Sequence, residues 1–157
     1  MTYCLGIKIE EGLVCLADGR VTAGRQLTSA RKVSLHGRPG QRFCTMTSGL
    51  RSLRDKTLAY LDRELTAERA QSVVSMLDAV ALYSQCLRRV AKEDRAALKA
   101  SDLTFDLHTI FAGWLPEDRE PALFLVYPEG NWIEVDRRTP YISIGATAYG
   151  KPILDRA

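Results

Sequence analysis

Two apolar runs separated by a short polar stretch open the chain and predict a β-hairpin. The predicted strands are Thr2–Ile9 and Leu13–Asp18, joined by residues 10–12, Glu-Glu-Gly. A three-residue hairpin loop that ends in glycine is a recognised type, because glycine adopts the left-handed conformation that this position needs. Such a loop pairs the last residue of the first strand with the first residue of the second, which places Thr2 and Asp18 on one face. A slip of one residue would move Asp18 to the other face.

The rest of the chain alternates between short apolar runs and two long helical patterns. Residues 19–30 are polar and turn-like. Helices are predicted where leucines recur at helical spacing from Leu50 to Leu65, and over Ser72–Leu98, whose inner face includes Leu77. Six further strands complete the predicted elements: Lys32–His36, Arg42–Thr47, Thr104–Trp114, Ala122–Tyr127, Trp132–Val135 and Tyr141–Ile144.

The order of these elements predicts the fold class. Strands come first, two helices follow, and strands return, which is typical of an α+β protein with antiparallel sheets rather than alternating βαβ units. Residues 148–157 look like the start of another element. Because two helices cannot cover both sides of so many strands, we expect one apolar sheet face to need a partner or further chain.

Composition narrows the functional classes. The 157 residues are 46% hydrophobic and 26% charged, which fits one globular domain, and the net charge of +3 is too small to favour nucleic acid. No apolar run approaches the roughly 18 residues of a membrane span, and the N-terminus lacks the pattern of a signal peptide. The four cysteines and two histidines lack metal-ligand spacing, so we expect reduced thiols, a cytoplasmic location and neither metal nor cofactor.

Thr2 is the first candidate for chemistry. If Met1 is removed, Thr2 carries a hydroxyl and a free α-amine, which is a nucleophile with its own base. An N-terminal amine has a pKa of roughly 7.7–8.0, so a useful fraction is unprotonated near neutral pH. The alternative is that threonine is simply tolerated at position 2.

Three further features could assist such a nucleophile. Asp18 ends an apolar strand, Lys32 begins the next one, and Ser48-Gly49 lies between a strand and a helix. A lysine ammonium lowers the pKa of a nearby hydroxyl, an aspartate orients that lysine, and backbone N–H groups at a helix start can hold an oxyanion. Each residue also has an ordinary interpretation, as a turn residue, a solvated edge residue or a helix cap.

Taken together, these residues resemble the proteasome β-subunit and HslV peptidase superfamily of N-terminal-nucleophile hydrolases. The opening Thr2-Tyr3-Cys4 and the closing residues 149–156 are most similar to its bacterial Anbu branch. The resemblance covers the whole chain, with the specific motifs in the first fifty residues. These motifs are Thr2, Gly12-Leu13-Val14, Ala17-Asp18, Arg20, Ala23-Gly24, Lys32-Val33 and Thr47-Ser48-Gly49.

The resemblance implies a fold and a site. The fold would be the four-layer αββα sandwich, as one domain over residues 1–157 that lacks the family's C-terminal portion and part of its second helical layer. Thr2 would be the nucleophile, with Asp18 and Lys32 as its charged partners and Ser48 and Gly49 as oxyanion donors. Other residues would contact substrate: Val21, Ala30, Met46 and Leu50 in an apolar specificity pocket, and Thr22 through its backbone. Core packing explains these pocket residues equally well.

Two departures from the family pattern bear on activity. The family places a serine beside the nucleophile, where this chain has Ala146 with Thr147 as a candidate substitute, and the family's later acidic and serine support residues lie in its C-terminal portion. Ser48 also replaces the family's usual glycine, a change that retains a backbone N–H. The expected function is a self-assembling threonine peptidase that forms an acyl-enzyme on Thr2. The alternatives are a catalytically silent scaffold subunit and an amidase acting on a small molecule.

Partners follow from the same resemblance. We expect peptide or unfolded protein as substrate and a homo-oligomer in the form of a ring or open spiral. An unidentified ATPase or regulator is a further expected partner, whereas nucleic acid and membrane are not.

Overall fold

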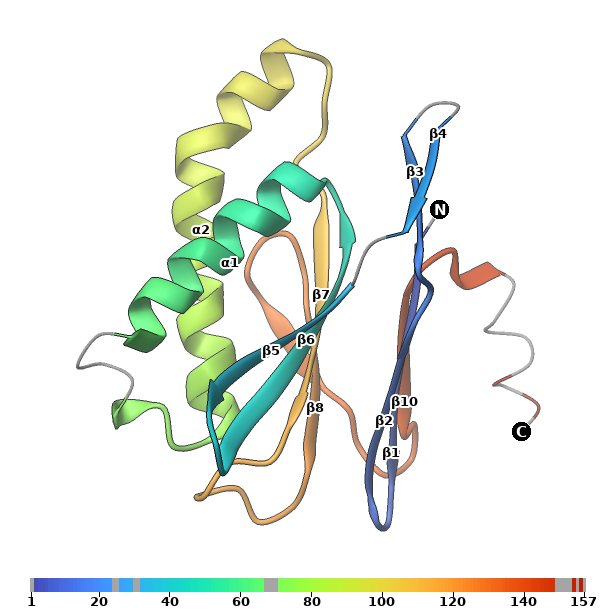
Figure 1. Ribbon diagram of the computed structural model, residues 1–157, viewed down its shortest axis with the longest axis vertical. Helices are drawn as coiled ribbons and strands as arrows, with labels where there is room; N and C mark the ends of the chain where they lie inside the picture. The colour runs from blue at the N-terminus through green and yellow to red at the C-terminus, as the bar shows by residue number, and fades with distance from the viewer. Residues whose placement is uncertain are drawn as a thin grey trace.

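A computed structural model describes residues 2–23, 26–29, 32–66, 71–148, 154 and 156 of the chain. Two sheets stack face to face, and two long helices cover the outer side of one of them (Figure 1). The five-stranded antiparallel sheet has the order β5-β6-β7-β8-β9 and the three-stranded sheet the order β10-β1-β2. The strands of the larger sheet are β5 (Val33–Arg38), β6 (Gln41–Gly49), β7 (Leu107–Gly113), β8 (Ala122–Val126) and β9 (Trp132–Glu134). Those of the smaller sheet are β1 (Tyr3–Ile9), β2 (Gly12–Ala17) and β10 (Tyr141–Gly145).

Strand alternation divides the interior into two cores. Along β7, Phe111 faces the helices α1 (Arg51–Thr66) and α2 (Met76–Ala100), whereas Ile110 faces the three-stranded sheet. Successive side chains of a strand point to opposite faces, so a sheet covered on both sides is apolar on both. The five-stranded sheet is therefore the central layer, and the predicted α+β class is confirmed.

The two predicted helices are present, with one shift in their boundaries. Ser75 caps α2, because its hydroxyl accepts the Asp78 N–H while the Asp78 carboxylate accepts the Ser75 N–H. This capping box starts the helix at Met76, later than the predicted Ser72. Leu77, predicted on the inner face, is 49% exposed.

The first hairpin differs from its predicted register by one residue. Gly12 belongs to β2 and pairs with Ile9, so the loop has two residues and Cys4 lies opposite Ala17. The φ of Gly12 is 151°, which a side chain would disfavour, and this conformation lets glycine pair directly after the turn. The predicted pairing of the strand ends through a three-residue loop was wrong.

A second hairpin occupies residues predicted as polar turn. β3 (Arg20–Ala23) and β4 (Gln26–Ser29) form a two-stranded antiparallel ribbon that extends from one end of the three-stranded sheet (Figure 1). The N-terminal end of the described chain lies at the base of this ribbon, beside the end of β10.

Candidate functional site

A buried ion pair joins the two sheets at the ribbon end of the molecule. The Lys32 Nζ lies 2.6 Å from Asp18 Oδ1, and the lysine side chain is 5% exposed while the aspartate side chain is 32% exposed. Lys32 stands directly before β5, and Asp18 directly follows β2. Because a buried lysine needs a paired carboxylate, Asp18 is the partner that balances Lys32 and fixes its orientation.

Asp18 also ties this ion pair to the N-terminus. Its Oδ1 accepts the N–H of Tyr3 at 2.7 Å, and its own N–H donates to the Tyr3 carbonyl at 3.0 Å. Tyr3 is covalently adjacent to Thr2, which is half-buried. Asp18 reaches Lys32 despite the shifted register because it lies one residue past the last residue of β2, where strand alternation no longer dictates its side-chain direction.

The turn after β10 closes the site from the other side. The N–H of Ala146 donates to the Thr2 carbonyl at 2.7 Å. Gly145 has φ 88°, and a Cβ placed there would meet that carbonyl and lie 3.3 Å from the Ser48 hydroxyl oxygen. Thr2, Gly145 and the Ser48 hydroxyl therefore meet at one point, and only glycine fits at position 145.

Ser48 and Gly49 lie at the end of a strand rather than at the start of a helix. Both belong to β6, and α1 begins two residues after Gly49. Gly49 has φ 134°, and a Cβ there would collide with the Asp106 carbonyl, which accepts the Leu50 N–H at 2.9 Å. Glycine is required here because the chain leaves the sheet in close contact with another backbone.

Cys4 lies beneath the ion pair and is poorly suited to act as a nucleophile. Its Sγ donates to the Thr47 carbonyl at 3.9 Å, and the residue is buried between the sheets. Burial raises the pKa of the Cys4 thiol to about 11, against the opposing effect of Lys32. A thiol that stays protonated at neutral pH is a weak nucleophile, so Cys4 serves as a packing residue.

His108 is a residue near the site that the sequence did not single out. It lies directly opposite Ser48 in the β6–β7 ladder, and its Nδ1 is 3.1 Å from the Asp106 carboxylate. Its ring meets that of Tyr127 edge to face at 6.0 Å. The sequence placed both His108 and Ser48 near strands but could not show that these strands are neighbours.

The structure places the expected pocket residues in different environments. Met46 is fully buried in the core between the sheets, and Leu50 packs against the helix-side core, so packing alone explains both. Val21 and Thr22 lie in β3, where they pair with Thr28 and Leu27. The side chains of Val21 and Thr22, and Ala30 altogether, lie outside the described residues.

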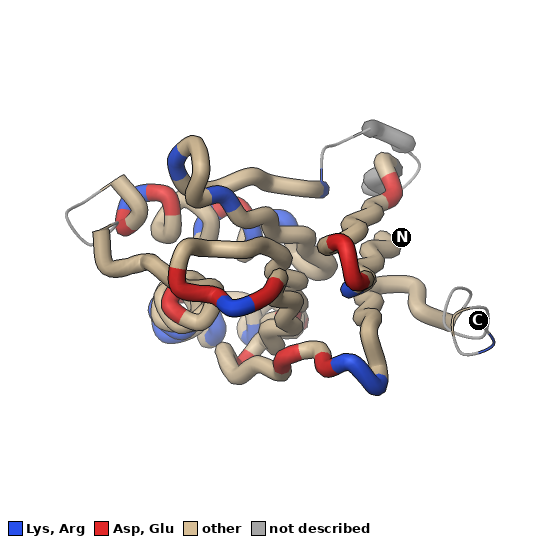
Figure 2. The backbone as a smooth tube through the Cα atoms, turned by 90° about the horizontal axis from the view of Figure 1, so that it is seen from below, with Lys and Arg blue, Asp and Glu red and all other residues tan. Residues whose placement is uncertain are grey.

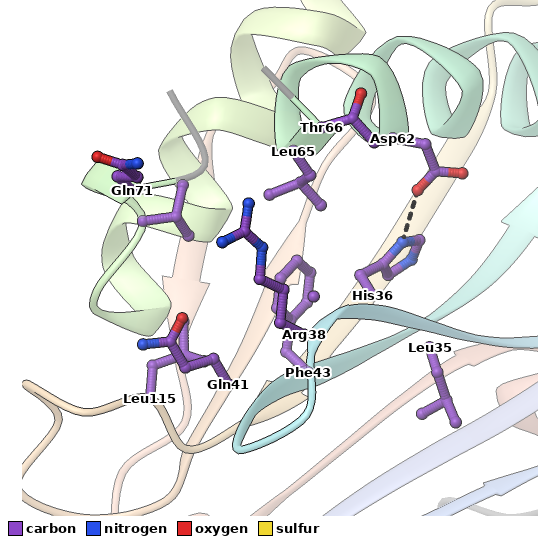
Figure 3. Close-up of a pocket in the computed structure, with 12 residues that line it drawn as sticks. Leu35, His36, Arg38, Gln41, Phe43, Asp62, Leu65, Thr66, Gln71 and Leu115 are labelled. Atoms are coloured by element: carbon purple, nitrogen blue, oxygen red, sulfur yellow. Dashed lines mark hydrogen bonds and ion pairs between the residues drawn. The ribbon is translucent and has the colours of Figure 1, made fainter. Parts of the chain in front are cut away.

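A separate cavity of about 650 Å³ lies at the other end of the central sheet, against the C-terminal turn of α1 (Figure 3). The buried His36 on its floor contacts Asp62 at 3.1 Å through Nδ1 and Thr45 at 2.9 Å through Nε2. Burial lowers the pKa of His36, while Asp62 opposes that shift. This cavity is distant in the fold from Thr2, so His36 belongs to the helix–sheet interface.

Elsewhere in the described residues, neither the distribution of charge nor the metal-ligating side chains indicate a second functional site. Acidic and basic residues alternate along the same loops and helices (Figure 2). Within the described ranges, no group of three or more His, Cys, Asp or Glu side chains could hold a metal ion. Among these same residues no helix combines the length and apolar character needed to cross a bilayer.

Known proteins match this arrangement over the whole chain. A sequence model of the family described as "Proteasome subunit" matches residues 2–157, whereas no curated protein sequence matches significantly. Anbu from Hyphomicrobium sp. strain MC1 superposes with a TM-score of 0.85 at 30% identity, and Anbu (ancestral beta-subunit) from Yersinia bercovieri with 0.84 at 29%. The helical assembly of the Anbu complex from Pseudomonas aeruginosa gives 0.88 at 31%.

Each of these three comparisons covers 99% of this chain but only 65% of the Anbu chain. The chain thus spans about two thirds of the length of these relatives. The family match, the stacked sheets and the helices on the central sheet agree, and the chain belongs to the proteasome-subunit family, with a fold similar to that of Anbu.

Proposed function

We propose that this chain is a proteasome-like threonine peptidase subunit of the cytoplasm, with Thr2 as its N-terminal nucleophile once Met1 is removed. The observation that carries this proposal is the buried Lys32–Asp18 pair at 2.6 Å, linked to the residue after Thr2 by the Tyr3 N–H. The proposal rests on the arrangement of charges around an N-terminal threonine in a fold whose family contains hydrolases of this kind.

In the proposed mechanism, the Thr2 hydroxyl attacks the carbonyl carbon of a peptide bond while the Thr2 α-amine accepts the hydroxyl proton. The Lys32 ammonium favours the developing alkoxide, and Asp18 keeps that ammonium in place. N–H groups at Ser48 and Gly49 hold the oxyanion of the tetrahedral intermediate. The amine product leaves with the proton, and water then hydrolyses the ester on Thr2. The β3 backbone at Thr22 and an apolar pocket with Val21, Ala30 and Leu50 bind the peptide, and the fully buried Met46 supports that pocket from the core.

Intact mass and covalent labelling test this proposal. We expect the expressed protein to lack Met1 and to gain one adduct on Thr2 when incubated with an electrophile such as a peptide epoxyketone. Thr2→Ala should lose the adduct, whereas Thr139→Ala, at an exposed loop position, should keep it. Retained Met1 together with an unlabelled Thr2 would exclude the peptidase.

A scaffold subunit is the second candidate, and one observation favours it. Ala146, whose N–H donates to the Thr2 carbonyl, stands where the family has a serine, and its own side chain supplies no hydroxyl. The relative from Pseudomonas aeruginosa forms a helical assembly, and we propose a homo-oligomer, as a ring or open spiral, for this chain too. An assembled protein that neither processes Met1 nor reacts with the electrophile would support the scaffold.

A further inference from the structure

Two cysteines from different sheets lie in contact. Cys15 is in β2, the edge strand of the three-stranded sheet, and Cys44 is in β6 of the central sheet. Their sulfur atoms are 3.8 Å apart, with the Cys44 thiol donating to the Cys15 sulfur. Both are free thiols and both are half-buried. A disulfide bond is about 2.05 Å long, so the two sulfurs would have to approach by only about 1.8 Å.

The surroundings of the pair leave room for this approach. Gly6 lies opposite Cys15 and Ala112 lies opposite Cys44, so each cysteine has a small cross-strand neighbour on one side. The sheets are also in close contact here, because a Cβ on Gly6 would lie 2.7 Å from Leu123 Cδ1. The sulfur contact at 3.8 Å, the small cross-strand neighbours and the close approach of the sheets at Gly6 together favour a bond between these two sulfurs.

A small oxidant can reach the pair from the side of β5. Leu35 pairs with Cys44, so the two residues share a face of the central sheet, yet Leu35 is 68% exposed. Figure 3 shows Leu35 pointing away from the cavity that His36 lines. The three-stranded sheet thus leaves this part of the face open, directly beside Cys44.

The contact also gives the two thiols different roles. The hydrogen bond from Cys44 lowers the pKa of Cys15 against the effect of its burial, whereas the same contact and burial raise the pKa of Cys44. Cys15 is therefore the sulfur that ionises first and attacks, and Cys44 is the partner that resolves the product.

We propose that Cys15 and Cys44 form a reversible intrachain disulfide across the two sheets, with hydrogen peroxide as oxidant. The Cys15 thiolate attacks one peroxide oxygen, the O–O bond breaks, and a sulfenic acid and hydroxide result. The Cys44 sulfur then attacks the Cys15 sulfur, the S–O bond breaks, and a second hydroxide leaves. With hydrogen peroxide, the two thiol protons convert both hydroxides to water, and each peroxide oxidises the dithiol by two electrons.

This bond would join the strands that lead into the candidate site. Asp18 follows Cys15 by three residues, and Ser48 follows Cys44 by four. Closing a loop of about 30 residues restricts the unfolded chain, and for a protein of this size we expect a rise in Tm of the order of 5–10 °C.

Mass spectrometry on the full 157-residue chain tests the proposal. After treatment with hydrogen peroxide, the intact mass should fall by two hydrogens, a peptide map should contain a Cys15–Cys44 crosslink, and dithiothreitol should reverse both. Cys15→Ser and Cys44→Ser should each lose the crosslink. The matched variants Cys4→Ser and Cys86→Ser remove buried thiols outside the pair and should retain it.

Three results would overturn the proposal. They are oxygen added to either cysteine in place of the crosslink, a crosslink involving Cys4, Cys86 or a second molecule, and an unchanged mass at peroxide levels that oxidise a free thiol in solution. Because the peptide map is made on the unmutated chain, the outcome does not depend on whether a serine variant folds. A Tm that is the same before and after complete crosslinking would contradict the expected effect on stability.

Discussion

At the scale of single residues, burial sets the energetic importance of each charge. Lys32 is almost completely buried and has Asp18 as its paired carboxylate, whereas the Asp55 side chain is 50% exposed and pairs with the exposed Arg51 and the partly buried Arg54. Removing one member of a buried pair leaves an uncompensated charge, but exposed pairs contribute little because water screens them.

Asp18→Asn should therefore lower the free energy of unfolding by about 3 kcal/mol, toward the lower end for a buried pair because Asp18 is itself partly exposed. The matched change Asp55→Asn should cost less than about 1 kcal/mol. Urea unfolding followed by circular dichroism measures both. Equal losses for the two variants would show that the Lys32–Asp18 pair is no more important than a surface pair.

His36 should make stability depend on pH. Burial holds its folded pKa below the ordinary value of 6.5, against the opposing effect of Asp62. The unfolded chain therefore binds the proton more readily, and the folded state loses stability as the pH falls below 6.5 and toward the folded pKa. One such group changes the free energy of unfolding by at most about 1.4 kcal/mol per pH unit.

The measurement is urea unfolding at pH 7.5 and at pH 5.5, on the natural chain and on His36→Gln. The natural chain should lose more stability between these two pH values than the variant does. If the variant shows the same drop, other groups cause the pH dependence.

At the scale of elements, close backbone contacts decide which glycines are essential. Gly49 and Gly40 both have positive φ, at 134° and 83°. A Cβ on Gly49 would collide with the Asp106 carbonyl, whereas a Cβ on Gly40 would have nothing within 4 Å. Gly40→Ala should cost about 1–2 kcal/mol for its left-handed backbone, and Gly49→Ala should cost more because β6 must also separate from Asp106. Thermal unfolding of the two variants compares them directly, and an equal cost would contradict the collision.

The sequence predicted elements better than it predicted their contacts. Helices and most strands follow from apolar periodicity, which is a local signal. The hairpin register failed because the conformation of Gly12, φ 151°, decides whether that residue belongs to the loop or the strand. The β3–β4 ribbon was missed because each of its strands has only four residues and mixes polar with apolar side chains, which is too short a pattern to stand out from a turn. The Lys32–Asp18 contact could be expected from a family pattern, but the proximity of Ser48 to Gly145, and of Cys15 to Cys44, depends on sheet stacking.

At the scale of the whole molecule, the two sheets differ in how far their faces are covered by other elements. The central sheet has helices on one side and the three-stranded sheet on the other. Leu13, Cys15 and Ala17 of β2 pack against the core between the sheets, so Val14 and Leu16 lie on the outer face, opposite Ile7 and the buried Leu5. Ile9, Val14 and Leu16 are exposed there. Contiguous exposed apolar side chains favour association, because burying them removes apolar area from water.

The chain of residues 1–157 should therefore self-associate through this face at micromolar concentrations, and Leu16→Lys should reduce that association. Leu16 is 55% exposed within the apolar face, whereas Leu103 is 48% exposed in the connection after α2, so Leu103→Lys is the matched control. Sedimentation velocity over a range of concentrations measures the weight-average sedimentation coefficient. We expect this coefficient to fall for Leu16→Lys and to stay unchanged for Leu103→Lys. An unchanged coefficient in both variants would place the association surface elsewhere, because a lysine in the middle of a buried apolar contact cannot be accommodated without cost.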